Sequence, residues 1–83
     1  MSALCVHVRD AEGILERVLM TTRRRGFRLY GCEVQLATIP THYDITLHVD
    51  SERPLSFLAN QLNKLVDVVY VRESNEERHA RRA

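Results

Sequence analysis

Apolar residues in this chain repeat first with the period of a strand and then with the period of a helix, twice over, and this alternation limits the fold more than any other feature. In residues 4–9 apolar and polar side chains alternate, which is typical of a half-buried strand. In residues 11–22 the apolar positions fall at helical spacing and predict an amphipathic helix. The pattern continues with strands predicted at 27–38, 43–49 and 66–71, and a helix that starts at 51–54 with its apolar stripe at 55–65.

The order βαββαβ predicts an α+β fold of the ferredoxin-like type, in which a four-stranded antiparallel sheet carries both helices on one face. In this topology the first and third strands are central and the second and fourth lie at the edges. A domain of 83 residues buries little apolar surface alone, and an edge strand as long as 27–38 presents unpaired backbone groups. We therefore expect a homodimer formed through edge strands.

Single residues mark where these elements begin, end or bend. Asp10 precedes the first helix and is expected to cap it through its carboxylate, and Gly26 follows that helix where a left-handed cap suits glycine. The apolar phase of the second strand slips, so a bulge is expected near Gly31. We assign residues 1–73 to one domain and residues 74–83 to a charged, disordered tail.

Composition excludes several classes of protein. No run approaches the roughly 18 apolar residues of a membrane span, and the first residues lack the basic and apolar segments of an export signal. Twelve basic and 11 acidic residues give a net charge of +1, so no global field attracts nucleic acid or an anionic membrane. Cys5 and Cys32 are too few for a disulfide scaffold. We expect a cytoplasmic protein with reduced thiols and with neither nucleic acid nor a membrane as partner.

The sheet face away from the helices gives no sign of catalysis, metal binding or RNA binding. On the central strands it is expected to expose Cys5, His7, Asp44, Thr46 and His48, none of which is an aromatic platform for stacking a base. His7 and His48 are interpreted as neighbouring surface histidines, fewer than the three or four ligands of a usual zinc site. No nucleophile lies beside a base in this pattern. We therefore assign no catalytic and no metal-ligating residue.

The loop between the first strand and the first helix is the strongest candidate for a ligand site. Gly13 lets a ligand or another backbone come close, and the free amides of a helix N-terminus attract a carboxylate. Asp10 can receive an ammonium group, so this loop, which runs on to Ile14, suits an amino acid. The same residues are explained equally well if Asp10 only caps the helix and Gly13 only permits close packing at a dimer interface.

Three segments give the chain a family resemblance. Residues 10–18 (DAEGILERV), followed by 25–27 (RGF), resemble the opening of the ACT domains in small subunits of acetolactate synthase (acetohydroxyacid synthase). Residues 61–68 (QLNKLVDV) resemble the second helix and last strand of those subunits, closest to the isozyme II type. The resemblance covers most of residues 4–72. The first motif is widespread among ACT domains, and the second is more specific.

The resemblance implies a regulatory subunit that is not an enzyme by itself and carries no cofactor. Its partner would be a large catalytic subunit with thiamine diphosphate, magnesium and FAD, and the small subunit would activate it. That enzyme condenses two pyruvates, or pyruvate with 2-oxobutyrate, in the synthesis of valine, leucine and isoleucine. The alternative is a free-standing ACT domain that senses an amino acid and regulates a different partner.

The resemblance also places an effector at the dimer interface, beside the first strand–helix loop. Asp10, Gly13 and Ile14 are then the candidate effector-binding residues for a branched-chain amino acid. Gly13 matches the family glycine, whereas Asp10 stands where valine-responsive subunits often carry asparagine. Its charge would hold an ammonium group but repel a carboxylate. Subunits of the isozyme II type are generally insensitive to valine and often lack the glycine, so the response to valine stays open.

Candidate residues for docking on the catalytic subunit are Arg24, Tyr30 and Phe57. Arg24 belongs to a run of three arginines, which is explained either by a solvated helix end or by a docking patch. Arginine and aromatic residues are the usual anchors of protein interfaces. Tyr30 and Phe57 break the apolar stripes of their elements and are expected to be exposed.

Overall fold

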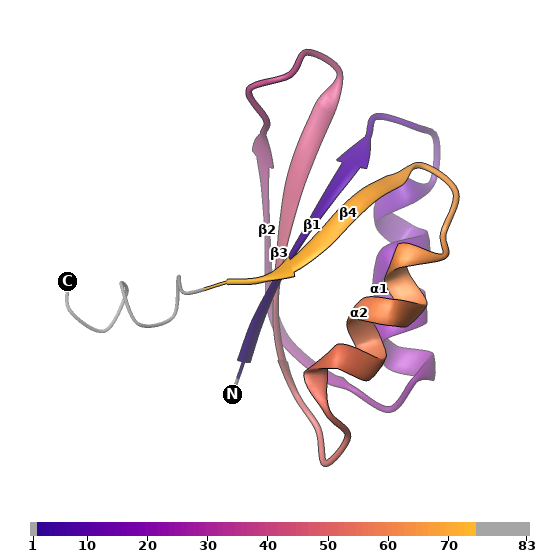
Figure 1. The fold of residues 1–83 in the computed structure, drawn as a ribbon, viewed down its shortest axis with the longest axis vertical. Coiled ribbons are helices and arrows are strands. Elements are labelled where there is room, and N and C mark those ends of the chain that lie inside the picture. The colour runs from indigo at the N-terminus through magenta and orange to yellow at the C-terminus, as the bar shows by residue number, and fades with distance from the viewer. Residues whose placement is uncertain (1, 75–83) are drawn as a thin grey trace, which may run out of the picture.

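The computed structural model of the chain describes residues 2–74, and within them the predicted order βαββαβ is confirmed (Figure 1). The elements are β1 (Ser2–Arg9), α1 (Ile14–Arg24), β2 (Arg28–Leu36), β3 (His42–Asp50), α2 (Leu55–Asn63) and β4 (Val68–Glu73). The tail predicted over 74–83 lies outside the described residues except for Ser74. The backbone N–H of Ser74 donates to the carbonyl of Ala3 at 3.0 Å.

The four strands form one antiparallel sheet in the order β2-β3-β1-β4. As predicted, β1 and β3 are therefore central and β2 and β4 lie at the edges. Both helices lie on the same face of the sheet (Figure 1), so the fold is a ferredoxin-like α+β structure of two layers. Neither helix in the described part of the chain is long and apolar enough to cross a membrane.

The core fills the space between the helices and the sheet. β1 contributes even-numbered residues and β3 odd-numbered residues, because side chains on a strand alternate between its two faces. The helices contribute residues from the predicted stripes at helical spacing. The buried apolar residues of the core are Leu4, Val6, Val8, Ile14, Val18, Phe27, Ile45, Leu47, Val49, Leu58 and Leu62.

β2 changes phase at a bulge, as the sequence predicted. Leu29 pairs with Val49, and the next paired residue is Gly31, opposite His48, so Tyr30 is the extra residue. Because side chains alternate along a strand, one extra residue moves the apolar side chains that follow it onto the same face as Leu29. The slip in the apolar pattern therefore records a real irregularity of the backbone.

β4 contains a second bulge, which the sequence did not predict. His7 of β1 pairs with Tyr70, but Val8 pairs with Val68, so Val69 is an extra residue in β4. The valines of this strand stand on both sides of the bulge, so the sequence carries no change of phase that reveals it.

The expected capping of α1 by Asp10 is wrong. α1 begins at Ile14, and its N-cap is Gly13, whose backbone is left-handed (φ 76°, ψ 8°) and which makes no side-chain cap. The N–H of Ile14 donates to the Ala11 carbonyl at 3.1 Å and closes a turn before the helix. Glycine adopts a positive φ at low cost, so this turn delays the helix and leaves Asp10 too far back to cap it.

The predicted left-handed glycine after α1 is confirmed. Gly26 has a φ of 87°, and its N–H donates to the Arg23 carbonyl at 3.1 Å. The N–H of Phe27 donates to the Thr22 carbonyl at 3.2 Å. These two bonds satisfy carbonyls at the end of the helix and turn the chain back toward the sheet.

The expectation of an exposed open face on the central strands is also wrong. His7 is 4% exposed and Thr46 is 8% exposed, and Cys5 is buried beside them, although neither α1 nor α2 lies over this face (Figure 1). Side chains of neighbouring strands supply the cover. The ring of Tyr70, on β4, stacks on His7.

Candidate functional site

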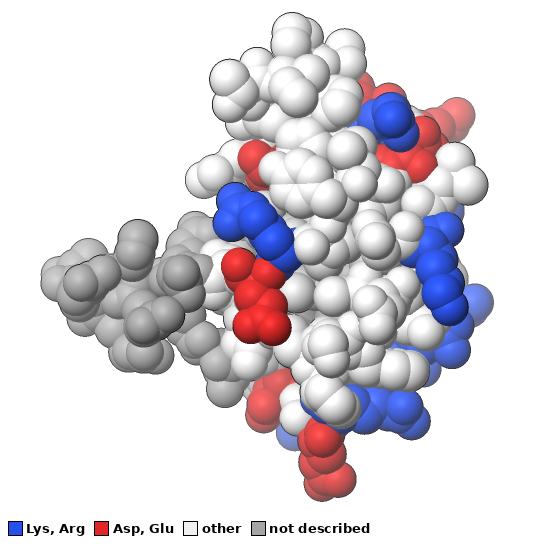
Figure 2. All heavy atoms as spheres, viewed as in Figure 1, with Lys and Arg blue, Asp and Glu red and all other residues white. Residues whose placement is uncertain are grey.

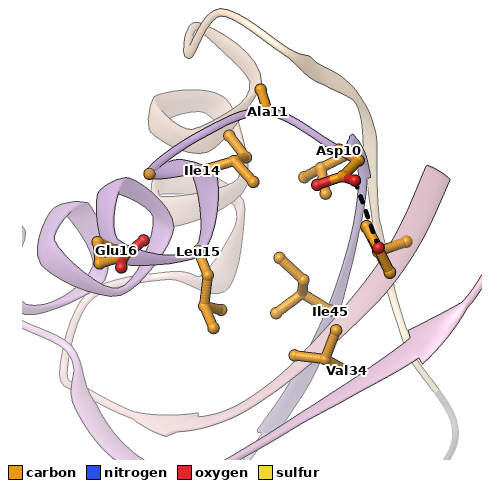
Figure 3. A pocket seen from close by; sticks show the side chains of 10 residues that line it. Asp10, Ala11, Ile14, Leu15, Glu16, Val34 and Ile45 are labelled. Carbon is orange, nitrogen blue, oxygen red and sulfur yellow. Dashed lines mark hydrogen bonds between the residues drawn. The ribbon is translucent and has the colours of Figure 1, made fainter. Parts of the chain in front are cut away.

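A hollow of about 190 Å³ lies where β1 leads into α1 (Figure 3). Its walls come from the loop before α1, the first turn of α1, and residues of the three strands β1, β2 and β3. Asp10, Gly13 and Ile14 all line it, so the structure brings together the three residues expected at an effector site. The turn that delays α1 provides the space, because the chain leaves the sheet before the helix begins.

Branched apolar side chains form most of the lining. Ile14 and Leu15 project into the hollow from α1, and Ile45 and Val34 line it from the sheet (Figure 3). Ile45 and Val34 are paired across β3 and β2. Val34 is 47% exposed, so the hollow is open on the β2 side. An aliphatic side chain placed here would bury apolar surface against these residues.

Asp10 stands at the polar rim of the hollow. Its backbone N–H donates to the Thr41 carbonyl at 2.8 Å, and its carboxylate accepts a hydrogen bond from the Tyr43 hydroxyl at 3.5 Å (Figure 3). The backbone contact fixes the Asp10 main chain at the end of β1, and the carboxylate lies beside the hollow instead of at the end of the helix. A carboxylate in this position can bind an ammonium group.

The first turn of α1 presents both backbone amides and a second carboxylate. Because Gly13 is the N-cap, the N–H groups of Leu15 and Glu16 have no acceptor within the helix. Such amides attract an anion, but the side chain of Glu16 also lines the hollow and repels one. With Asp10 nearby, the charges favour the ammonium end of an amino acid over its carboxylate end.

The three expected docking residues lie toward the other end of α1. Arg24 is the last residue of α1 and is exposed, and Tyr30, at the bulge of β2, is 52% exposed. Phe57 differs from the expectation because it is partly buried and packs against the core. Its ring is large enough to reach the core from beside Leu58, and the guanidinium of Arg53 lies 5.0 Å from the ring centre.

Sequence reasoning missed a chain of hydrogen bonds on the open face of the sheet. His7 Nδ1 lies 2.7 Å from Asp44 Oδ1, and His7 Nε2 lies 2.9 Å from His42 Nδ1. An ionised Asp44 requires the proton on His7 Nδ1, and a neutral His7 then accepts at Nε2 from His42. Tyr70 stacks on His7, with ring centroids 4.7 Å apart and an angle of 2° between the planes.

His48 does not join this chain, contrary to the expectation that His7 and His48 are neighbouring surface histidines. The register pairs His7 with Asp44 and His48 with Ala3, and His48 Nε2 lies 3.5 Å from a carboxylate oxygen of Glu33. Among residues 2–74 no group of three or more His, Cys, Asp or Glu side chains is arranged to hold a metal ion.

The two cysteines occupy different environments and are not joined in a disulfide. Cys5 is buried on the central strand β1, and Cys32 is exposed on the edge strand β2. Partial burial, together with the charge of Glu33, raises the pKa of the Cys32 thiol. A raised pKa lowers the thiolate fraction on which cysteine nucleophilicity depends, so the environment of Cys32 does not activate its thiol.

Comparison with known sequences identifies the domain. Residues 10–71 match the family described as ACT domain. The acetolactate synthase isozyme 2 small subunit of Escherichia coli (strain K12) is 44% identical over 57 residues, which cover 69% of this chain and 66% of that protein. The acetolactate synthase small subunit of Mycobacterium bovis is 35% identical over 75 residues, 89% of this chain and 45% of that one. The chain thus spans about two thirds of the first relative and less than half of the second.

Solved structures share the fold. The crystal structure of the acetolactate synthase small subunit from Thermotoga maritima matches with a TM-score of 0.78 and 23% identity, over 87% of this chain and 45% of that chain. The ACT domain from GTP pyrophosphokinase of Chlorobium tepidum matches with a TM-score of 0.75 and 12% identity, over 88% and 95%. At these identities the likeness concerns the fold alone. From its βαββαβ architecture and the match over residues 10–71, the chain belongs to the ACT-domain family, and its curated relatives include small subunits of acetolactate synthase.

Proposed function

We propose that the chain is a regulatory subunit of acetolactate synthase, which binds and activates a thiamine diphosphate-dependent catalytic subunit in branched-chain amino acid biosynthesis. The observation that carries the proposal is the sequence likeness, 44% and 35%, to two proteins named as small subunits of that enzyme. In this proposal the chain is not an enzyme by itself. Thiamine diphosphate, magnesium and FAD belong to the catalytic subunit, and both subunits are cytoplasmic.

A second copy of the chain is the proposed partner of the edge strand β2. Val34 is 47% and Leu36 is 79% exposed, although both face the helix side of the sheet. The N–H of Ala37 donates to His42 of β3 at 3.0 Å. Along an edge strand, the backbone N–H and C=O groups of successive residues point alternately toward the neighbouring strand and away from it. Because those of Ala37 point toward β3, those of Cys32, Val34 and Leu36 point away from the sheet. An exposed apolar edge of this kind is suited to pairing with another strand.

Charge and apolar character favour one register for the two copies of β2. An antiparallel pair centred on Val34 places Val34 opposite its own copy, Cys32 opposite Leu36, and Glu33 opposite Gln35. A pair centred on Glu33 instead places two like charges directly opposite, which is destabilising. Both registers place the helices of the two copies on the same face of the joined sheet. The charge of Glu33 therefore decides between the two registers.

In that arrangement the hollow lies at the junction of the two copies. Val34 lines the hollow and stands beside the two-fold axis, so the second copy closes the side that is open in one chain. Valine, leucine or isoleucine is the proposed effector. Its branched side chain would contact Ile14 and its ammonium group would contact Asp10, while Gly13 keeps the approach free of side-chain atoms.

The regulatory role is tested by adding the chain to the acetolactate synthase catalytic subunit of the same organism. We expect the two proteins to elute together and acetolactate formation to rise, and we expect the chain alone to form none. If acetolactate formation is unchanged by saturating amounts of the chain, the proposed role fails.

The effector site is tested by calorimetric titration with valine, leucine and isoleucine. Asp10→Ala should abolish the heat of binding, because it removes the carboxylate that holds the ammonium group. Glu12→Ala is the matched control, since Glu12 is an exposed acid in the same loop that does not line the hollow. If none of the three amino acids gives heat at millimolar concentration, Asp10 and Gly13 retain only structural roles.

The register is tested by disulfide cross-linking through the natural Cys32. In this register Cys32 and Leu36 form a hydrogen-bonded antiparallel pair, whose Cα atoms are about 5.5 Å apart, a distance that a disulfide spans. Leu36→Cys should therefore give a covalent dimer on mild oxidation. Gln35→Cys, on the other face of β2, should not. Equal cross-linking of both variants would reject the register.

The second candidate function is an amino acid sensor with a different partner. The hollow favours this alternative, because a single chain supplies both Asp10 and the branched residues of the lining. These residues are available for an amino acid whichever protein the chain binds. A chain that binds a branched-chain amino acid but neither binds nor activates the catalytic subunit would establish this alternative.

A further inference from the structure

We propose that five arginines at one end of the molecule form the docking surface for an acidic surface of the catalytic subunit. They are Arg23, Arg24, Arg25, Arg28 and Arg53, and we call this group the arginine end. The proposal rests on the function proposed above and adds to it which surface of the chain binds the partner and by what chemistry.

The arginine end is assembled from three parts of the fold. α1 ends at Arg24, β2 begins at Arg28, and Arg53 lies two residues before α2. The Arg53 Nε lies 3.6 Å from the point where a side chain on Gly26 would begin, so the glycine after α1 leaves room for it. In Figure 2, Lys and Arg side chains gather along the right-hand side and lower end of the molecule, where Figure 1 shows the helices and the turn into α2.

None of these five arginines forms an ion pair with a residue in the range 2–74. The ion pairs there involve Arg17 with Asp67, His7 with Asp44, and His48 with Glu33, and all three lie elsewhere. Two acids, Asp50 and Glu52, line a groove at this end. Asp50 stands opposite Arg28 in the β2–β3 register, but its carboxylate accepts the Ser51 N–H at 3.1 Å. Five guanidinium groups outnumber two carboxylates, so this end carries a local positive charge. The net charge of the whole chain, which is only +1, does not reveal it.

Two of the arginines are held against aromatic rings. The guanidinium of Arg28 lies 5.7 Å from the ring centre of Tyr30, and that of Arg53 lies 5.0 Å from the ring centre of Phe57. Cation–π contacts of this kind fix a guanidinium before a partner arrives, which lowers the entropy lost on binding. Arginine beside an aromatic ring is the typical composition of an interface hot spot.

A solvated helix end does not explain the whole group. Favourable interaction with the helix dipole accounts for basic residues in the last turn of α1, but Arg28 and Arg53 lie outside that helix. A groove of about 370 Å³ lies beside Arg28, lined by Gly26, Arg28, Asp50, Ser51 and Glu52. The surface is therefore concave as well as basic.

The mixture of charges favours an acidic protein surface over nucleic acid. Asp50 and Glu52 line the same groove as Arg28 and would repel a phosphate backbone, which carries only negative charge. A protein surface can place carboxylates on the arginines and a basic residue on these two acids. Such interleaved charges fix the register of a complex and exclude wrong partners.

The decisive variant is the double charge reversal Arg28→Glu with Arg53→Glu, because both positions lie outside the helices. Its control is Arg9→Glu with Arg72→Glu, which makes the same change of net charge at two exposed arginines of the open face. Binding to the purified catalytic subunit is measured by calorimetry at low and high salt. Circular dichroism and thermal unfolding confirm that each variant is folded.

We expect the charge reversal at the arginine end to weaken binding at least tenfold and the control to weaken it less than threefold. We also expect high salt to weaken binding of the wild type more than binding of the Arg28/Arg53 variant. If the wild type binds and both variants bind equally well, the docking surface is wrong while the proposed function stands. If the wild type itself does not bind, the proposed function fails and the docking surface with it. Binding of single-stranded RNA or duplex DNA by the wild type, lost in the Arg28/Arg53 variant, would assign the surface to nucleic acid and overturn the proposal.

Discussion

The two faces of the sheet are both closed to solvent at their centre, but by different means. On one face α1 and α2 cover the strands, and Val6 and Leu47 are fully buried. Neither α1 nor α2 lies on the other face (Figure 1), yet His7 is only 4% exposed. There the cover comes from side chains of the sheet itself, with Asp44 bonded to His7 and Tyr70 stacked on it.

The two faces therefore depend on different physical properties of their residues. Apolar burial has no direction and scales with area, so the helix-covered face depends on volume. A hydrogen-bonded chain depends on donors, acceptors and distances, so the open face depends on chemical identity. A substitution that keeps volume should be tolerated on the first face and fail on the second.

The largest effect is expected from Leu47→Ala, on the helix-covered face. Leu47 is fully buried, so its truncation loses transfer free energy and leaves a cavity, at a cost of about 2–5 kcal/mol in the free energy of unfolding. Urea denaturation measures the loss. Met20→Ala is the control, since Met20 is an apolar residue that is 49% exposed. Equal losses for both variants would contradict the assigned core.

His7→Ala should have the next largest effect. It leaves Asp44 and His42 without the ring that bonds to both, and an unsatisfied partner costs about 1–3 kcal/mol. A double-mutant cycle with Asp44→Ala isolates the pair, with an expected coupling of about 0.5–3 kcal/mol. Strictly additive losses in urea unfolding would show that the hydrogen bond contributes nothing to stability.

Tyr70→Ala should cost less, about 0.5–1.5 kcal/mol, because it removes a stacked ring but no hydrogen bond of the chain. It also uncovers His7, so the imidazole should become accessible to diethyl pyrocarbonate. Tyr30→Ala, at the opposite edge of the sheet, is the control, and its thermal midpoint should change little. If Tyr30→Ala lowers the midpoint more than Tyr70→Ala does, the stack is not the cover of the open face.

The smallest effect is expected from His48→Ala. This histidine lies on the same face and strand as His42 and Asp44, but its contact is with the half-exposed Glu33 at 3.5 Å. Exposed pairs of this kind contribute about 0–1 kcal/mol, so unfolding in urea should be nearly unchanged. A loss as large as that of His7→Ala would erase the distinction between a buried chain and a surface pair.

The helix-covered face was predictable from the sequence and the open face was not, for a physical reason. Apolar alternation records which side chains face a core, so it predicted the strands, the helical stripes and the phase slip at Gly31. Cover on the open face depends on contacts of His7 with His42 and Asp44, which are 35 and 37 positions away in the sequence. Periodicity identifies the face on which such polar residues lie, but not which of them meet.

The candidate site likewise has a part that the sequence predicted and a part that it did not. Asp10, Gly13 and Ile14 were predicted because they are close together in sequence, beside a turn. Val34 and Tyr43 join them only through strand pairing, which no local pattern reveals. The role of Asp10 changed because the positive φ of Gly13 moved the start of the helix, and a positive φ is not visible from residue types alone.

The bulges at Tyr30 and Val69 bear on how far this sheet can grow. A sheet with two regular edges is a template for filaments, since each added chain offers another edge. Here β2 has one regular stretch, 32–36, beyond its bulge, and β4 is a short strand bent by its own bulge. Two chains that pair through β2 leave only β4 edges facing outward. In the homodimer proposed above, the regular edge of each chain is therefore used up, and no regular edge is left to add further chains.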